Sequence, residues 1–142
     1  TCSKKKGFIK NFMTVNKENI RYFVRDILGC GCPEEVFNII DPVFHIKIDN
    51  VLLKGKINIG NRLLIYMIEG DGLNLDSLIP FLIDYGKKER DSKGFNRLRI
   101  VLVFEDLDAV KEQANSVFQN YNKDEKIHLH LIKKGMIPPF YS

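Results

Sequence analysis

Two segments near the start of the chain place their apolar residues at helical spacing. The first covers residues 17–28, with Asn16 as its N-cap and Gly29 where a left-handed C-cap is favoured. The second covers residues 33–40 and is stopped by Asp41-Pro42, because the residue before a proline avoids the helical region. The pattern therefore predicts two helices before the first strand.

Alternation with a period of two replaces the helical period after these helices. It predicts strands at residues 43–48, 51–59 and 63–68, separated by the turn residues Asp49-Asn50 and Gly60-Asn61. Strands joined by such tight turns pair in antiparallel fashion. We therefore expect a three-stranded antiparallel meander.

Helical and strand patterns then alternate in the second half of the chain. A helix is predicted to start near Asp76, so that Pro80 falls in its first turn, and the nearly continuous apolar run 98–104 follows it. An amphipathic helix over residues 107–121 precedes a last strand at 127–132. Strand–helix–strand connections of this kind are right-handed and pair their strands in parallel.

Together these elements predict an α/β fold. Its mixed sheet consists of an antiparallel meander followed by a βαβαβ unit, has helices on its faces, and is preceded by the two N-terminal helices. The 142 residues suffice for one domain with its own core, and we expect a single α/β domain over residues 16–142. Residues 1–15, which include Lys4-Lys5-Lys6 and lack the apolar region of a secretory signal, are expected to form a flexible tail.

Composition and charge give no support to several classes of protein. The net charge is +4, but basic residues are interspersed with acidic ones, and no nucleic-acid recognition motif is present. No apolar run approaches the ~20 residues that a membrane-spanning helix needs. Three cysteines in a chain with ample apolar residues do not indicate a disulfide scaffold, so a cytoplasmic location is expected.

The most unusual motif is Cys30-Gly31-Cys32-Pro33, between the two predicted helices. Cys32 is expected to cap the second helix, where free N–H groups would stabilise a thiolate, although Glu34 and Glu35 oppose this effect. The two thiols could close a small, reducible disulfide or bind a metal. The structural alternative is that both cysteines are small residues that fill a helix–helix turn.

A metal site at this motif would need further ligands, because closed zinc sites have about four. His128 and His130 are two residues apart on a predicted strand, so their rings should point to the same face. Cys30, Cys32, His128 and His130 therefore form a candidate site for zinc or another transition metal. The alternative is that both histidines belong to the polar face of an edge strand.

Two acidic segments follow predicted parallel strands: Glu69-Gly70-Asp71-Gly72 and Glu105-Asp106-Leu107-Asp108. Ligands of such sheets bind beyond the carboxyl ends of the strands, and carboxylates gathered there could hold Mg²⁺. The structural alternative is a turn at Glu69–Gly72 and a helix cap at Asp106 or Asp108.

Glu69-Gly70 and Asp106-Leu107-Asp108 resemble the motifs of the Toprim catalytic domain of primases, topoisomerases and small nucleases. The resemblance implies that Glu69 acts as acid or base and that Asp106 and Asp108 bind Mg²⁺ in a phosphoryl-transfer reaction. It covers only the second half of the chain. One helix is predicted between the two motifs, where the family has an additional strand–helix unit.

Two functional hypotheses follow. The first is a small accessory or interaction domain with a protein partner and a possible thiol or metal site at the Cys-Gly-Cys-Pro turn. The alternative is a Toprim-like, Mg²⁺-dependent enzyme. No glycine-rich phosphate loop and no serine-centred elbow is present to support a nucleotide-binding or hydrolase hypothesis.

Overall fold

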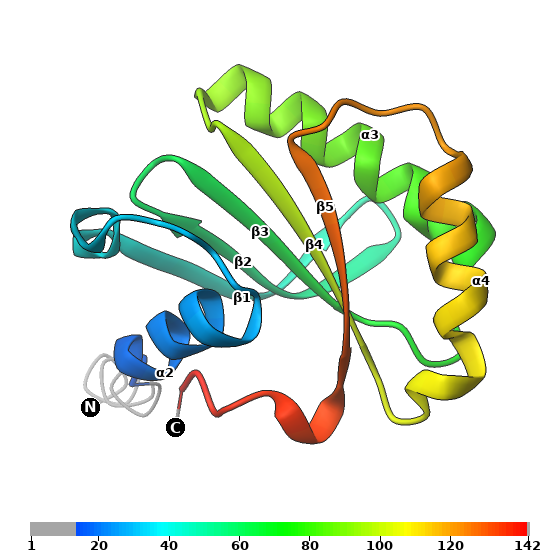
Figure 1. Cartoon of the computed structure of the whole chain (residues 1–142), viewed down its shortest axis with the longest axis horizontal. Helices are drawn as coiled ribbons and strands as arrows, with labels where there is room; N and C mark the ends of the chain where they lie inside the picture. Colours follow the sequence, from blue (N-terminus) through cyan, green and yellow to red (C-terminus); the bar gives the residue numbers. More distant parts are fainter. Residues whose placement is uncertain (1–13, 142) are drawn as a thin grey trace, which may run out of the picture. The chain divides into compact units, whose positions relative to one another are not determined.

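A computed structural model describes residues 14–141, which divide into two compact units (Figure 1). Of these described residues, one unit contains those up to Cys32 together with those from Ile137 onward, and the other is Pro33–Met136. Among residues 14–141, none of the helices combines the length and the apolar character that a membrane crossing needs.

The first unit begins with α2 (Lys17–Tyr22), which continues into the π-helical turn η1 (Phe23–Ile27). The side chain of Asn16 accepts a hydrogen bond from the backbone N–H of Asn19 at 2.9 Å, which confirms the predicted N-cap. Gly29 adopts a φ of 71°, the left-handed conformation that its position favours.

The C-terminal residues of the chain belong to the same unit as α2. The backbone N–H of Asn16 donates to the carbonyl of Phe140 at 2.7 Å, and Val15 forms an isolated antiparallel bridge with Tyr141. The rings of Phe23 and Phe140 meet edge to face with centroids 5.3 Å apart. Residues 1–13 of the predicted tail lie outside the described residues.

The second unit contains a five-stranded mixed sheet in the order β1-β2-β3-β4-β5. β1–β2 and β2–β3 are antiparallel, whereas β3–β4 and β4–β5 are parallel, which confirms the predicted meander and βαβαβ unit. The strands are β1 (Ile40–Ile48), β2 (Val51–Ile59), β3 (Leu63–Glu69), β4 (Arg97–Phe104) and β5 (Ile127–Lys133).

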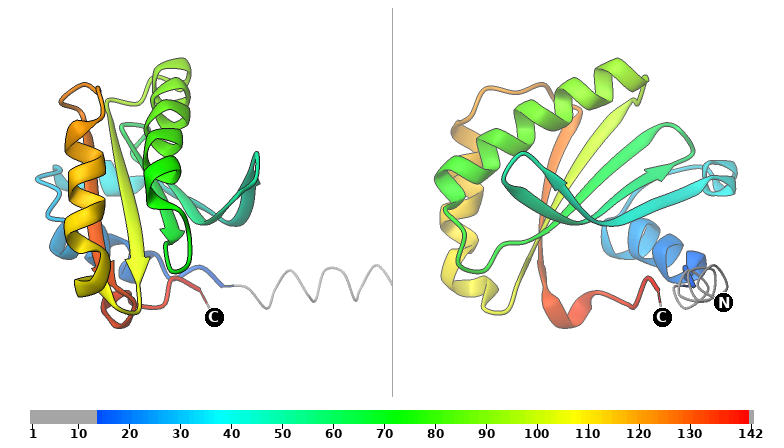
Figure 2. Two further views of the ribbon diagram at one scale, coloured as in Figure 1. Left: turned by 90° about the vertical axis from the view of Figure 1, so that its right-hand side faces the viewer. Right: turned by 180° about the vertical axis from the view of Figure 1, so that it is seen from behind.

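Helices α3 (Leu75–Lys93) and α4 (Leu107–Asn120) connect the parallel strands and share one hydrophobic core with them. Right-handed crossovers to successive neighbouring strands place both helices on the same face of the sheet. From behind, α3 crosses in front of the strands, and the β1–β2 hairpin reaches over it (Figure 2). The largest buried side chain of this core is Tyr66.

The second helix predicted before the sheet is present, but only as a short 3-10 helix. Residues Glu34–Asn38 form only a 3-10 turn (η2), and its N-cap is Pro33 in an extended conformation with ψ 153°, so Cys32 caps no α-helix. β1 starts at Ile40 and includes Pro42 instead of being preceded by a break there. Pairing with β2 outweighs the local helical pattern, and proline is tolerated because β1 is an edge strand.

α3 starts within one residue of the predicted position near Asp76. The Asn74 side chain accepts hydrogen bonds from the backbone N–H groups of Asp76 at 3.1 Å and Ser77 at 3.4 Å. The helix therefore begins at Leu75, and Pro80 lies in its second turn rather than its first. One backbone hydrogen bond of the helix is lost at this proline.

Two polar contacts anchor α3. The Glu89 carboxylate accepts hydrogen bonds from the buried Tyr66 hydroxyl and from the ammonium groups of Lys56 (2.7 Å) and Lys93 (2.8 Å). The next residue, Arg90, forms a bidentate pair with Asp124 in the loop before β5. Its Nη1 and Nη2 atoms lie 2.9 and 2.6 Å from the two carboxylate oxygens of Asp124.

Candidate functional site

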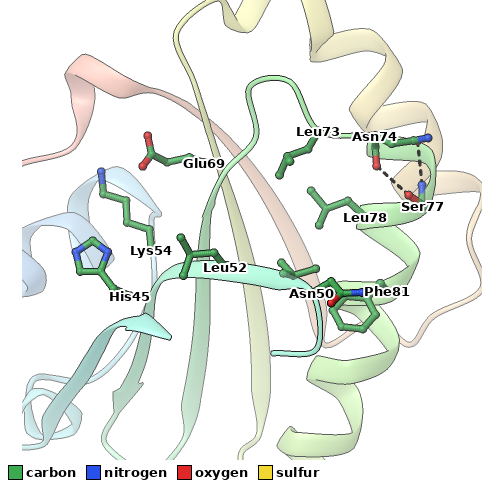
Figure 3. Close-up of a pocket in the computed structure, with 11 residues that line it drawn as sticks. His45, Asn50, Leu52, Lys54, Glu69, Leu73, Asn74, Ser77, Leu78 and Phe81 are labelled. Atoms are coloured by element: carbon green, nitrogen blue, oxygen red, sulfur yellow. Dashed lines mark hydrogen bonds between the residues drawn. The ribbon is translucent and has the colours of Figure 1, made fainter. Parts of the chain in front are cut away.

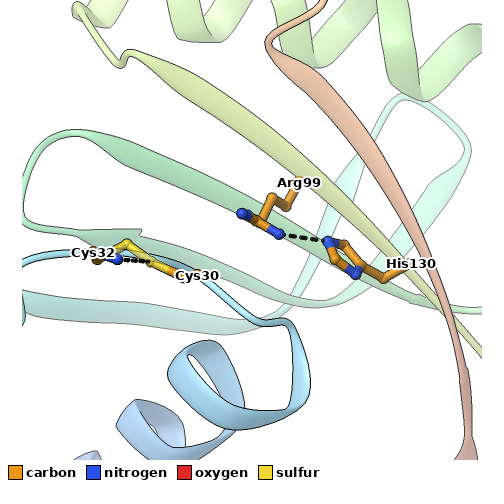
Figure 4. The surroundings of a disulfide bond; sticks show 4 residues. All are labelled: Cys30, Cys32, Arg99 and His130. Carbon is orange, nitrogen blue, oxygen red and sulfur yellow. Dashed lines mark hydrogen bonds between the residues drawn. A yellow bond between two sulfur atoms is a disulfide. The ribbon is translucent and has the colours of Figure 1, made fainter.

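The structure joins Cys30 and Cys32 through their sulfur atoms, with the two Cα atoms 5.2 Å apart (Figure 4). Cys30 is 6% exposed, and its backbone N–H donates to the carbonyl of Val24 at 3.1 Å. The backbone N–H of Cys32 lies 3.1 Å from the Cys30 sulfur. Of the sequence alternatives, this arrangement is that of the small disulfide.

His128 and His130 lie on β5, an edge strand, and both contact arginines of β4. Arg99 donates to Nε2 of His130 at 2.8 Å, and Nη1 of Arg97 lies 3.5 Å from Nε2 of His128. Burial, followed by the charge of Arg99, lowers the pKa of His130 to about 4 and also lowers that of His128. Both imidazoles are therefore neutral near pH 7.

The two halves of the predicted metal site belong to different units, the cysteines to the first and the histidines to the second. Within residues 14–141, no three His, Cys, Asp or Glu side chains are grouped so that they could hold a metal ion. The contacts with Arg97 and Arg99 also occupy the histidine Nε2 atoms and add positive charge beside them. The site of Cys30, Cys32, His128 and His130 remains a prediction.

The acidic strand ends are organised by hydrogen bonds and a lysine. Lys134 lies between the carboxylates of Glu69 and Glu105, 3.4 Å from each. The Asp71 carboxylate accepts a hydrogen bond from the backbone N–H of Glu105 at 3.0 Å, which ties the two loops together. A lysine ammonium thus supplies the positive charge between the two glutamates.

Asp106 is the N-cap of α4, where its side chain makes no capping hydrogen bond, and Asp108 lies in the first turn. Asp108 has the position at which carboxylates stabilise a helix dipole. Glu69, Asp106 and Asp108 are not among any metal-binding group of the described residues. The Mg²⁺ site at these three residues remains a prediction.

Packing against Phe104 is sufficient to explain why residue 70 is a glycine. A Cβ atom at this position would overlap the ring of Phe104, which is 1% exposed. We expect Gly70→Ala to lower the free energy of unfolding by about 1–2 kcal/mol, because the ring must move within a close-packed core. Urea denaturation measures this effect, with Gly72→Ala as a control for backbone strain at a glycine whose Cβ would meet nothing within 4 Å. A stability equal to that of the wild type would contradict the packing explanation.

A cavity of about 560 Å³ lies between the β1–β2 hairpin, the end of β3 and the start of α3 (Figure 3). Leu52 and Leu73 line it from opposite sides and are 56% and 45% exposed. Leu78 and Phe81 of α3 add further apolar surface. Exposed leucines gathered around a cavity are characteristic of a binding surface.

The cavity lies where β2 and β3 separate. The ladder between β2 and β3 ends at the pair Gly55–Met67, whereas the ladder between β1 and β2 continues to Ile48–Val51. Among residues 14–141, the segment Val51–Lys54 therefore pairs with β1 and with no second strand. Within the described part of the chain, its other edge lacks a strand partner because β3, which continues to Glu69, pairs there only with β4.

Some polar side chains of the cavity have ion-pair or hydrogen-bond partners, and Lys54 has no ion-pair partner among the described residues. Glu69 is paired with Lys134, whereas no described residue forms an ion pair with Lys54, whose side chain extends toward Glu69 in Figure 3. Asn74 and Ser77 are engaged in capping α3. His45 has a φ of 55° at the point where the β1–β2 pairing is interrupted, opposite Lys54. A cationic group is thus available beside an apolar wall.

Sequence reasoning did not identify these cavity residues. Leu52 and Lys54 look like ordinary positions of an alternating strand, and Leu73 like a loop residue before a helix. The only local signal is an apolar side chain at Leu52 on the exposed side of its strand. Their proximity depends on how far the β2–β3 ladder extends, which is a tertiary property.

Comparisons with known proteins give no relative. No protein-family profile matches the sequence, and neither a curated protein nor a solved structure matches the chain. The similarity to the Toprim motifs therefore rests on the five quoted residues alone. Function is inferred from the geometry of the chain's own residues.

Proposed function

We propose that the protein is a small accessory domain that binds a partner protein in the cavity between the β1–β2 hairpin and α3. The observation that carries the proposal is the open edge of Val51–Lys54 beside an apolar cavity. The partner segment is an extended peptide that lies along this edge. The three cysteines support a reducing compartment such as the cytoplasm as its location.

An open strand edge favours a peptide over other ligands, because it presents backbone groups at the spacing of another strand. In an antiparallel ladder, every second residue directs its N–H and C=O to the same neighbour. Two of the four residues Val51–Lys54 therefore direct both groups away from β1. A peptide that pairs with them gains main-chain hydrogen bonds, while its alternate side chains reach flanking pockets.

Side chains around the cavity define the composition of the peptide. Leu52, Leu73, Leu78 and Phe81 accommodate an apolar residue. Lys54 favours a carboxylate nearby, since Glu69 is already paired with Lys134. The expected ligand is therefore an extended segment in which apolar and acidic residues alternate.

Selection of phage-displayed random nonapeptides on the full chain tests this proposal. We expect enriched peptides with the alternating pattern, and at least about tenfold weaker binding, ~1.4 kcal/mol, to the Leu52→Asp and Leu73→Asp proteins. Both leucines are exposed, so these changes should leave the fold intact. Met136→Asp, at a residue 58% exposed and outside the cavity, is the matched control and should bind as the wild type does.

Two further measurements separate the elements of the proposal. Lys54→Glu should reverse the preference from acidic to basic peptides. N-methylation of alternate peptide residues should weaken binding in one register and have little effect in the other, because only one set of N–H groups pairs with β2. Peptides that bind all cavity variants equally would exclude the cavity as the site. Equal tolerance of both methylation registers would exclude strand addition.

A further inference from the structure

Independently of peptide binding, we propose that Cys30 and Cys32 form a reversible dithiol–disulfide pair that exchanges with a small thiol–disulfide couple such as glutathione. The site is a redox modification site in the first unit. Its chemistry uses only the two cysteines and the external couple.

The backbone places the two residues at a distance suited to a disulfide. Their Cα atoms are 5.2 Å apart, within the range of about 4.4–6.8 Å seen for disulfides. Gly29, with a φ of 71°, redirects the chain after the helix, and the hydrogen bond from the Cys30 N–H to Val24 holds the first cysteine in place. The pairing is therefore built into the way the helix ends.

Gly31 between the cysteines serves no packing purpose. A Cβ atom at this position would meet nothing within 4 Å. The residue gives the short segment conformational freedom, so that the sulfurs can both approach and separate. A ring closed across one intervening residue is readily reduced, because strained disulfides have more oxidising potentials than relaxed ones.

The two cysteines differ in accessibility, which assigns their roles. Cys30 is 6% exposed, whereas Cys32 is partly exposed, so an external disulfide reaches Cys32 first. The Cys32 thiolate attacks oxidised glutathione, which gives a mixed disulfide and one glutathione thiolate. The Cys30 thiolate then attacks the Cys32 sulfur and displaces the second glutathione. The two cysteine protons end on the two released glutathiones, so one disulfide is reduced as another forms.

The position of the pair gives its oxidation a structural consequence. Cys32 is the last residue of the first unit, directly before Pro33 of the second. A bond between Cys30 and Cys32 removes freedom from the chain segment that joins the two units. Amide hydrogen exchange over residues 29–34 is expected to slow on oxidation.

The test uses the 142-residue chain with Cys2→Ser, in which Cys30 and Cys32 are the remaining cysteines. The protein is equilibrated in buffers with different ratios of oxidised to reduced glutathione and then alkylated in acid. Mass spectrometry should show an intramolecular disulfide, seen as the loss of two hydrogen atoms. Excess reduced glutathione should reverse this change. The ratio of oxidised to reduced glutathione that oxidises half of the protein should be at least about tenfold lower for the native protein than for the same protein in concentrated urea, because the fold positions the thiols. Near-equal glutathione ratios at half-oxidation for the native and the urea-unfolded protein would overturn the proposal that the fold positions the thiols.

Single variants test the assigned roles. Cys30→Ser should accumulate glutathione on Cys32, because no second thiol displaces it, while Cys32→Ser should remain largely unmodified while folded. Circular dichroism checks that both variants keep the fold. The proposal is overturned if both cysteines carry glutathione without forming a bond to each other, or if the disulfide persists in excess reduced glutathione.

Discussion

Glu89→Ala is expected to lower the free energy of unfolding by about 3–4 kcal/mol at pH 7, because it removes the common partner of three groups. The Tyr66 side chain is fully buried, and its hydroxyl donates to Glu89. Lys56 and Lys93 would lose their ion pairs at the same time. Urea denaturation of both proteins measures the difference.

Lowering the pH should also lower the free energy of unfolding of the wild-type protein through Glu89. Burial of Glu89 would by itself raise its pKa, but hydrogen bonds from Lys56, Lys93 and Tyr66 outweigh it and hold the pKa at about 2, below the ordinary value of 4.5. A carboxyl with a lowered pKa stabilises the folded state fully above pH 4.5. This contribution is lost as the pH falls from about 4.5 to about 2.

Tyr66→Phe and Lys93→Ala divide the network into its parts. Tyr66→Phe removes only the hydroxyl and should cost about 1 kcal/mol, and Lys93→Ala, at an exposed side chain, less than about 1 kcal/mol. The acid loss between pH 4.5 and 2 should be smaller in Glu89→Ala than in the wild type. An unchanged acid profile together with unchanged stability would mean that Glu89 does not hold α3 on the sheet.

Arg90→Ala is the second change with a large expected effect, a loss of about 2–3 kcal/mol. Arg90 is 5% exposed and is held by two hydrogen bonds to Asp124. The hydrogen bonds from Arg90 lower the pKa of Asp124 to about 2. The loss stays below that of a fully buried pair because the Asp124 side chain is 35% exposed and can be hydrated.

Asp91→Ala is the matched control for Arg90→Ala. Asp91 also contacts Arg90, at 3.0 Å, but its side chain is 57% exposed, so its removal should cost less than about 1 kcal/mol. Thermal unfolding at neutral pH compares the three proteins. Equal destabilisation by both changes would show that the bidentate pair with Asp124 has no special importance.

Local features of the sequence account for most of the fold. The turn residues Asp49-Asn50 and Gly60-Asn61 appear where predicted, because residues that tolerate positive φ mark tight hairpins by themselves. β2 has the predicted bounds, Val51–Ile59. The difference from the helix predicted at residues 33–40 has a tertiary cause. An apolar pattern with a good first turn became a short 3-10 turn and a strand, because Ile40–Ile48 pairs with β2.

Candidate chemistry was less predictable than the fold. Proximity in sequence correctly indicated a contact between Cys30 and Cys32, since only one residue separates them. The contacts of Glu69 and Glu105 with Lys134 involve residues far apart in the chain, which no periodicity reveals. The same holds for the arginine contacts of His128 and His130.

The sequence by itself determined the order of strands and helices, the antiparallel meander and the parallel second half. Periodicity and turn residues are local properties, and the handedness of strand–helix–strand connections follows a general rule. Only the tertiary structure decided where the β2–β3 ladder ends. That end leaves Val51–Lys54 with an open edge and places Leu52 opposite Leu73 across the cavity. Such features arise from packing between residues distant in the chain, where a shift of one strand pair would create or remove the site.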